Sequence, residues 1–151
     1  MCQGPFPETE MTDAAFDPAS PASYAHWSEE RVRYSDTDAM GHVNNNAYGI
    51  YFETARLFFF RDSGIRLGER RSVVVVRITM NFLRELTWPN DVRVGTRMTR
   101  LGGKSFTYAQ GLFVGDRCHA TAETVSAMFD LETRQSFPVP DELRQRFAAE
   151  A

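Results

Sequence analysis

The hydrophobic positions of the chain follow a helical pattern in residues 44–63 and an alternating pattern after them. The helical stretch is apolar round most of its circumference, apart from a narrow polar stripe of Asn46, Gly49, Glu53 and Arg56. Asn44 and Asn45 are good N-cap residues, and Gly64 is a suitable stop signal. The pattern therefore predicts one long helix that other parts of the chain wrap.

Alternation of apolar and polar side chains predicts a short strand before this helix, at residues 31–34, and four strands after it. The four are expected at residues 73–84, 91–101, 104–114 and 118–129. Gly102 and Gly103 are a hairpin signal, and a short terminal helix is expected at 141–147, after two prolines. The order predicts an α+β fold, with a five-stranded antiparallel sheet curled around one long central helix.

Composition indicates one water-soluble domain. The chain has 151 residues, of which 42% are hydrophobic and 25% charged, as in ordinary globular proteins. Its longest apolar runs are far shorter than the roughly 20 residues that a membrane helix needs. Residues 1–24, rich in Pro, Ala and acid, are expected to be a flexible tail ahead of a domain at 25–151. We see no secretory leader, so we expect a cytoplasmic protein.

Charge and cysteine content exclude several classes of function. The net charge of -3 comes from the first 25 residues, which hold four acidic residues and no Lys or Arg. The remainder, with 17 basic and 16 acidic residues, offers no charge-based case for nucleic acid or a membrane surface. Cys2 and Cys118 form neither a disulfide framework nor a CxxC metal or redox pair.

Candidate chemistry is concentrated in the loop that leads into the long helix. Asp36, Asp38 and His42 lie there, just before the unpaired N–H groups of the helix start, which can polarise a carbonyl oxygen. A carboxylate beside such a site can act as nucleophile or as general base, which suits attack on an ester or thioester. Each residue alone is also an ordinary turn, loop or cap residue. Two carboxylates and one imidazole are a weak metal pattern, so we expect no metal and no cofactor.

The stretch Asp-Thr-Asp-Ala-Met-Gly-His-Val-Asn-Asn-Asn-Ala-Tyr, at residues 36–48, precedes Tyr-Phe-Glu-Thr-Ala-Arg at 51–56. Together they resemble the hotdog-fold acyl-CoA thioesterases of the 4-hydroxybenzoyl-CoA thioesterase type, and the likeness covers roughly residues 27–147. The resemblance implies a hotdog fold and hydrolysis of a fatty or aromatic acyl-CoA. It also implies a homodimer or homotetramer with the active site at the interface.

The resemblance also implies roles for single residues. Asp38 matches the catalytic aspartate, Asn45 the residue whose backbone N–H polarises the thioester carbonyl, and Tyr48 a tyrosine that lines the site. His42 matches the histidine of plant acyl-ACP thioesterases, although Met40 replaces the asparagine of their motif. Because of this second likeness, both coenzyme A and acyl carrier protein remain candidates for the carrier of the acyl group.

Other residues and functions remain as alternatives. Lys104 and Ser105, at a predicted hairpin, are candidates for binding the phosphates of coenzyme A, and Glu53 with Arg56 is expected to form an i,i+3 ion pair. A hotdog hydratase is disfavoured because the chain lacks the Asn-Pro element of the hydratase motif. A non-catalytic acyl-CoA-binding hotdog protein is the alternative function.

Overall fold

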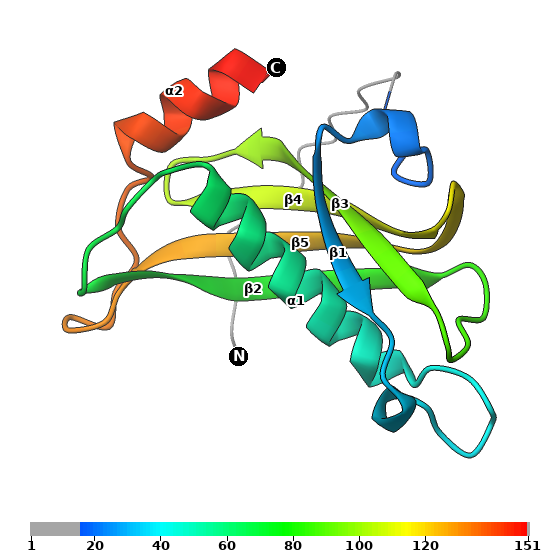
Figure 1. Cartoon of the computed structure of the whole chain (residues 1–151). Coiled ribbons are helices and arrows are strands. Elements are labelled where there is room, and N and C mark those ends of the chain that lie inside the picture. Colours follow the sequence, from blue (N-terminus) through cyan, green and yellow to red (C-terminus); the bar gives the residue numbers. More distant parts are fainter. Residues whose placement is uncertain (1–15, 151) are drawn as a thin grey trace.

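The computed structural model describes residues 16–150, which form one antiparallel sheet, one long helix and several short elements (Figure 1). In chain order the elements are η1 (Pro21–Ser23), β1 (His26–Arg31), η2 (Tyr34–Asp36), α1 (Asn45–Asp62), β2 (Arg71–Phe82), β3 (Asp91–Leu101), β4 (Ser105–Val114), β5 (Arg117–Asp130) and α2 (Asp141–Glu150).

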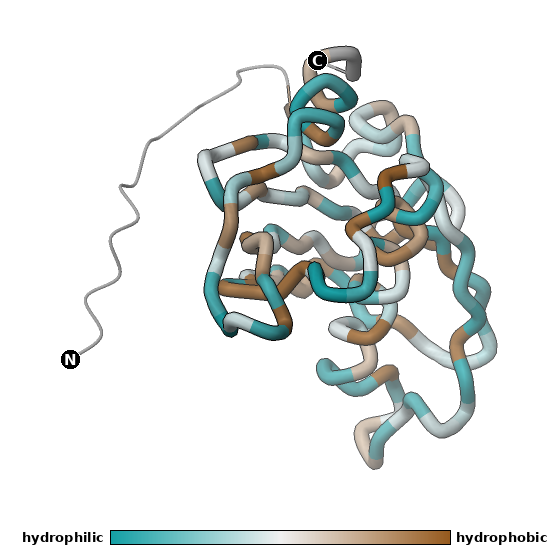
Figure 2. Tube along the Cα trace, turned by 90° about the vertical axis from the view of Figure 1, so that its left-hand side faces the viewer, coloured by the Kyte–Doolittle hydropathy of each residue, from teal (hydrophilic) through white to brown (hydrophobic). Residues whose placement is uncertain are grey.

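The five strands form a single sheet in the order β1-β3-β4-β5-β2, with every neighbouring pair antiparallel. Strands β3, β4 and β5 follow one another through hairpins, whereas β1 and β2 occupy the two edges. Hydrophilic residues dominate α2, next to the C-terminus (Figure 2). The expected α+β architecture, a five-stranded antiparallel sheet with one long helix, is therefore confirmed.

Helix α1 begins and ends at the predicted signals. The side chain of Asn44 accepts a hydrogen bond from the Asn46 N–H, and Gly64 takes a φ of 75° just beyond the last turn. The helix lies diagonally across the sheet and contacts β1, β3 and β4 (Figure 1). Phe52 and Ala55 face the sheet with no exposed surface. Burial of a side chain like that of Phe52 stabilises the fold by about 1.5–3 kcal/mol.

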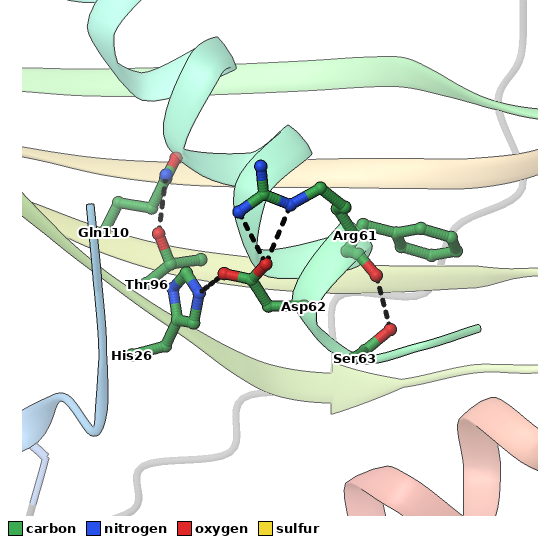
Figure 3. A network of polar contacts seen from close by, with 7 residues as sticks. His26, Arg61, Asp62, Ser63, Thr96 and Gln110 are labelled. Atoms are coloured by element: carbon green, nitrogen blue, oxygen red, sulfur yellow. Dashed lines mark hydrogen bonds and ion pairs between the residues drawn. The ribbon is translucent and has the colours of Figure 1, made fainter. Parts of the chain in front are cut away.

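Polar side chains fasten α1 to the sheet at two points. In the middle, Gln110 of β4 donates from Nε2 to the Phe52 carbonyl and to Thr96 Oγ1, both at 3.0 Å. At the C-terminal end, His26 of β1 lies 2.9 Å from Asp62, which also pairs with Arg61 (Figure 3). The buried amide of Gln110 needs these partners, and together with the partly exposed His26–Asp62 pair it fixes where the helix sits on the sheet.

The first strand differs from the prediction. Residues 26–31, rather than 31–34, pair with β3, and the chain then turns away through η2. The cause is local, because the Asp36 carboxylate accepts the Arg33 N–H at 2.9 Å and so closes a turn. The remaining strands lie within two residues of their predicted bounds, and α2 extends three residues beyond the predicted helix.

The folded part of the chain also begins earlier than residue 25. Most of the expected tail, residues 1–15, lies outside the described residues, but Tyr24 is only 6% exposed. Its ring packs edge-to-face on Phe113 and Trp27, and its hydroxyl donates to the Pro18 carbonyl at 2.7 Å. Aromatic burial therefore holds residues 16–24 against the face of the sheet opposite α1.

Two expectations about α1 are wrong. The sheet does not wrap the helix completely, since Ile50 and Leu57 are 57% and 66% exposed. Arg56 does not form an ion pair with Glu53 but is buried and donates to Gln110 and Thr124 of the sheet. The long Arg56 side chain instead runs beneath the helix, where its two acceptors on β4 and β5 lie.

Packing of Tyr24 on the sheet predicts the effect of a small substitution. A Cβ at Gly95 would collide with the Tyr24 ring, so Gly95→Ala should lower the free energy of unfolding by about 1–3 kcal/mol in urea titrations. Gly103→Ala is the matched control, because its added Cβ meets no atom within 4 Å. Equal stability of the two variants would contradict the described position of residues 16–24.

Candidate active site

The carboxylate of Asp38 lies half-exposed in the turn between η2 and α1. Its Oδ1 accepts the Met40 N–H and its Oδ2 accepts the side-chain amide of Asn44, both at 2.9 Å. These hydrogen bonds, the one from Asn44 first, hold the pKa of Asp38 below its usual range, and the proximity of His42 lowers it further. Asp38 is therefore an ionised carboxylate at neutral pH.

Asn44 ties this carboxylate to the start of α1. One amide group does both tasks: Oδ1 accepts the Asn46 N–H at 3.0 Å, and Nδ2 donates to Asp38. Sequence reasoning found only the capping role of Asn44. The second role has no sequence signal, because six residues separate Asn44 from Asp38 and only the folded turn brings them together.

Asn45 is the first residue of α1, as predicted. Its N–H belongs to the group of donors that a helix start leaves without an intrahelical acceptor. The next two N–H groups, of Asn46 and Ala47, are bound by the side chain and the carbonyl of Asn44. The site thus combines an ionised carboxylate with the positive end of a helix, and the Asn44 side chain contacts both.

Asp36, the other carboxylate of the loop, has a structural role. Its Oδ2 accepts the Arg33 N–H and the hydroxyl of Tyr51, the latter at 2.5 Å, while its carbonyl accepts the Asn44 N–H at 2.8 Å. Burial, followed by the bond to Asp36, raises the pKa of Tyr51. These contacts clamp η2 to α1 and leave Asp38 as the carboxylate available for chemistry.

His42 and Tyr48 lie near Asp38 but differ in exposure. His42 shares the Asp38 turn, since its carbonyl accepts the Asp38 N–H at 3.1 Å, and its half-buried ring lies 3.4 Å from the Val43 carbonyl. Tyr48, on the first turns of α1, is 3% exposed, and burial raises its pKa. Its ring packs edge-to-face on Phe82 at the end of β2, at a centroid distance of 5.1 Å.

The β3–β4 hairpin, which holds Lys104 and Ser105, lies by the C-terminal end of α1, whereas the loop that holds Asp38 leads into its N-terminal end (Figure 1). The Lys104 carbonyl accepts the Met128 N–H, and this hairpin adjoins the residues that pack on the C-terminal turns of α1. The 18 residues of α1 span about 27 Å. Within one chain the structure therefore brings Asp38, His42, Asn45 and Tyr48 together and leaves Lys104 and Ser105 apart from them.

Two features are absent from residues 16–150. These residues contain no group of three His, Cys, Asp or Glu side chains placed to hold a metal ion. None of their helices is long and apolar enough to span a bilayer. A cleft of about 520 Å³ lies between β1, α2 and the C-terminal turns of α1, near His26, and does not include Asp38.

Comparison with known proteins assigns the family. A sequence model of the thioesterase-like superfamily matches residues 32–147, so the chain belongs to that superfamily. The uncharacterised protein YsmA of Bacillus subtilis (strain 168) is 25% identical over 126 residues, which are 82% of this chain and 85% of YsmA.

Solved structures agree with this assignment. A probable thioesterase from Bartonella henselae is 31% identical with a TM-score of 0.70, and the match covers 76% of this chain and 97% of that one. The DHNA-CoA thioesterase of Staphylococcus aureus, at 19% identity, shares the fold with a TM-score of 0.76 over 82% of this chain and 89% of its own. The fold is therefore the expected hotdog fold, and the protein is a thioester hydrolase.

Removing the Asn44 amide should change the pH dependence of thioester hydrolysis. Asn44→Ala removes the main hydrogen bond that lowers the pKa of Asp38, so the acid limb of a pH–rate profile should move to higher pH. The lost helix cap should also cost about 1 kcal/mol of stability in urea titrations.

Asn44→Ser is the matched control, since serine caps a helix as well as asparagine does but lacks the amide donor. It should keep the stability of the wild type and still show the displaced acid limb. An acid limb that stays in place in both variants would contradict the link between Asn44 and Asp38.

Proposed function

We propose that the protein hydrolyses the thioester of a fatty or aromatic acyl-CoA, with Asp38 as nucleophile or general base. The observation that carries the proposal is the single Asn44 side chain that joins an ionised carboxylate to the start of a helix. A thioester needs these two elements at its carbonyl, an attacking group and a donor for the oxygen that becomes negative.

The steps follow from this arrangement. The Asn45 N–H donates to the thioester carbonyl oxygen and stabilises the negative charge that develops on it. In one route the Asp38 carboxylate attacks the carbonyl carbon, the C–S bond breaks, and water then hydrolyses the resulting anhydride. In the other, Asp38 takes a proton from water, whose oxygen attacks the carbon, and the departing thiolate receives the proton. Both routes give a carboxylic acid and a free thiol.

Exposed apolar side chains beside the loop support an acyl substrate. Tyr34 and Trp88 are 72% and 48% exposed and pack edge-to-face at 5.2 Å. Their segments are joined where the Val43 N–H donates to the Leu86 carbonyl at 2.7 Å. Large apolar groups exposed next to a polar site are typical of surfaces that bind a ligand or a second chain.

We also propose that the protein works as a homodimer joined through β2. This strand has 12 residues, pairs only with β5 among the described strands, and therefore presents a long open edge. Four of its apolar side chains are between 38% and 51% exposed, namely Val75, Val76, Ile78 and Phe82. A soluble protein covers such an edge, and a second copy provides a matching one.

A dimer joined through β2 would also give a role to the β3–β4 hairpin, which holds Lys104 and Ser105 far from Asp38 of the same chain. Antiparallel pairing of β2 with its copy lays the end of one strand beside the start of the other. The end of β2 adjoins Tyr48 and the Asp38 loop, whereas its start lies near the Lys104 hairpin. Lys104 and Ser105 of the partner subunit would therefore lie at the Asp38 end, where they could bind the phosphates of coenzyme A.

Removal of the Asp38 charge tests the chemistry. Asp38→Asn nearly preserves volume and keeps one of the two accepted hydrogen bonds, so we expect kcat/KM for acyl-CoA hydrolysis to fall about 100-fold or more in a protein that still unfolds cooperatively above the assay temperature. The assay detects the released thiol with a panel of short, long and aromatic acyl-CoAs and one acyl carrier protein thioester. Asp116→Asn, on an exposed hairpin residue, is the control and should keep full activity.

Two other results would each have a clear meaning. Full activity in Asp38→Asn would contradict the role of Asp38. An inactive wild type whose melting temperature rises with acyl-CoA would favour a non-catalytic acyl-CoA-binding protein. A single turnover in heavy-oxygen water tests the covalent route, because an unlabelled first product molecule would have taken its new oxygen from Asp38, whereas direct attack by water always labels it.

A charge on the open edge of β2 tests the assembly. Val75→Lys places a lysine where the side chain is 51% exposed, so the monomer should fold, but two like charges would face each other across the twofold axis. We expect the dimer dissociation constant, from sedimentation velocity over a dilution series, to rise at least about tenfold. Leu131→Lys, at an exposed turn residue, should leave it unchanged.

A further inference from the structure

The cleft of about 520 Å³ lies at the C-terminal end of α1 and does not include Asp38. It forms where the pairing of β1 with β3 stops. His26, the first residue of β1, pairs with Thr96, and β3 continues over residues 97–101 with no strand on that edge among the described residues. The last turns of α1 and α2 supply the other walls (Figure 1). This volume is within the range of about 300–1,000 Å³ that is typical of small-molecule sites.

Much of the wall of this cleft is apolar. Five side chains supply this apolar part: Phe59 and Phe60 from α1, Met98 from β3, and Leu143 and Phe147 from α2. All five belong to or pack against the core cluster at this end of the molecule, so the wall is held in place from behind. It offers a ligand a surface for a hydrocarbon chain or ring.

A histidine and an aspartate form a polar part of the same cleft. His26 Nε2 lies 2.9 Å from one oxygen of Asp62, and Arg61 pairs with the other oxygen at 2.7 Å (Figure 3). These bonds, the one from His26 first, lower the pKa of Asp62. Asp62 is therefore an ionised carboxylate that already has two partners. Because a carboxylate only accepts hydrogen bonds, Nε2 of His26 carries the hydrogen between them.

The other ring nitrogen of His26 has no partner. Nδ1 is buried, and no described residue forms a hydrogen bond with it. Within residues 16–150, only the hydroxyl of Ser28, two residues further on the same face of β1, is another buried side-chain group of this kind. Such groups are rare in folded proteins because an unmade hydrogen bond is costly. Since His26 lines the cleft, a ligand there would supply the missing contact.

The charge of the cleft favours an anion. Arg97 lines it, and no ion pair formed within residues 16–150 includes this residue. Its Nη1 lies 3.5 Å from the Ser23 carbonyl, and its guanidinium lies 5.1 Å from the centre of the Phe16 ring. Arg146 of α2 is a second cation in the lining, against Asp62 as the one acidic residue. The described lining therefore has more positive than negative charge.

We propose that this cleft binds a free carboxylic acid with an apolar body, whose carboxyl group lies between Arg97 and His26. A carboxyl group suits both states of the His26 ring. As an acid it donates its hydrogen to a bare Nδ1, and as a carboxylate it accepts from a protonated one. Acids of this class are products of the thioester hydrolysis proposed above, and only this naming of their source rests on the proposed function.

Other ligand classes match the cleft less well. An alcohol would meet Nδ1 of His26 but would leave the positive charge of Arg97 without a counter-ion. An amine would be repelled by Arg97 and Arg146. An acyl-CoA has a thioester in place of the carboxylate at the end of its apolar part, so it lacks the group that Arg97 would bind.

Methionine methyl resonances in the isotope-labelled full chain locate a bound acid directly. Met98 reports on the cleft, whereas Met40, 78% exposed in the Asp38 loop, reports on the proposed catalytic site. Leucine replacements at these two positions assign the resonances, because they nearly conserve volume. We expect octanoate to move the Met98 resonance in a saturable manner, with a dissociation constant of about 1 mM or below, whatever Met40 does.

Arg97→Gln tests the contact with the carboxyl group. The affinity for octanoate, measured at Met98, should fall at least about tenfold because a charge-assisted hydrogen bond is lost. The affinity for octanol, which has the same apolar body and no charge, should stay unchanged. Arg117→Gln, at an exposed residue outside the cleft, removes the same charge and is the matched control. It should bind octanoate as the wild type does.

Several results would overturn this inference. A Met98 resonance that octanoate leaves in place in the wild type would do so, and a shift of Met40 alone would assign the acid to the proposed catalytic site. Equal losses of affinity in Arg97→Gln and Arg117→Gln would contradict a specific contact. The titration needs no turnover, so a protein that binds octanoate at Met98 but hydrolyses no thioester would support this site and contradict the proposed function.

Discussion

The side chain of Asn44 connects the two parts from which the candidate active site is built. Its oxygen starts α1 by accepting the Asn46 N–H, and its nitrogen holds the carboxylate of Asp38. A free carboxylate on a loop would sample many positions, at a cost in entropy each time it reached the substrate. Here the bond that begins the helix also fixes the carboxylate, so attacking group and carbonyl-polarising end stay in register.

The position of α1 on the sheet determines where a second copy can bind. Gln110 fastens the helix from below and His26 from the β1 side, which draws α1 over β1, β3 and β4. The other half of the sheet ends in the open edge of β2. One asymmetric placement thus leaves β2 as a strand with an open edge that α1 does not contact closely.

Two buried polar side chains fix this arrangement from within one chain. Gln110 is completely buried, and its amide bonds to the helix backbone, to Thr96 and to Arg56. Arg56 donates to Gln110 and Thr124, and the negative charge of Glu53 in the same chain favours its charged form. A hydrogen-bonded network of this kind gives the helix one position on the sheet.

Local pattern by itself determined the elements and the loop that we propose as the catalytic one. Caps at Asn44 and Gly64 and alternation in the strands depend only on neighbouring residues, and so could be predicted closely. Tertiary structure alone decided that β1 starts at His26, that Arg56 turns under the helix, and that Lys104 lies far from Asp38. These features depend on which distant residues meet, and a one-dimensional pattern of polarity holds no information about distance across the fold.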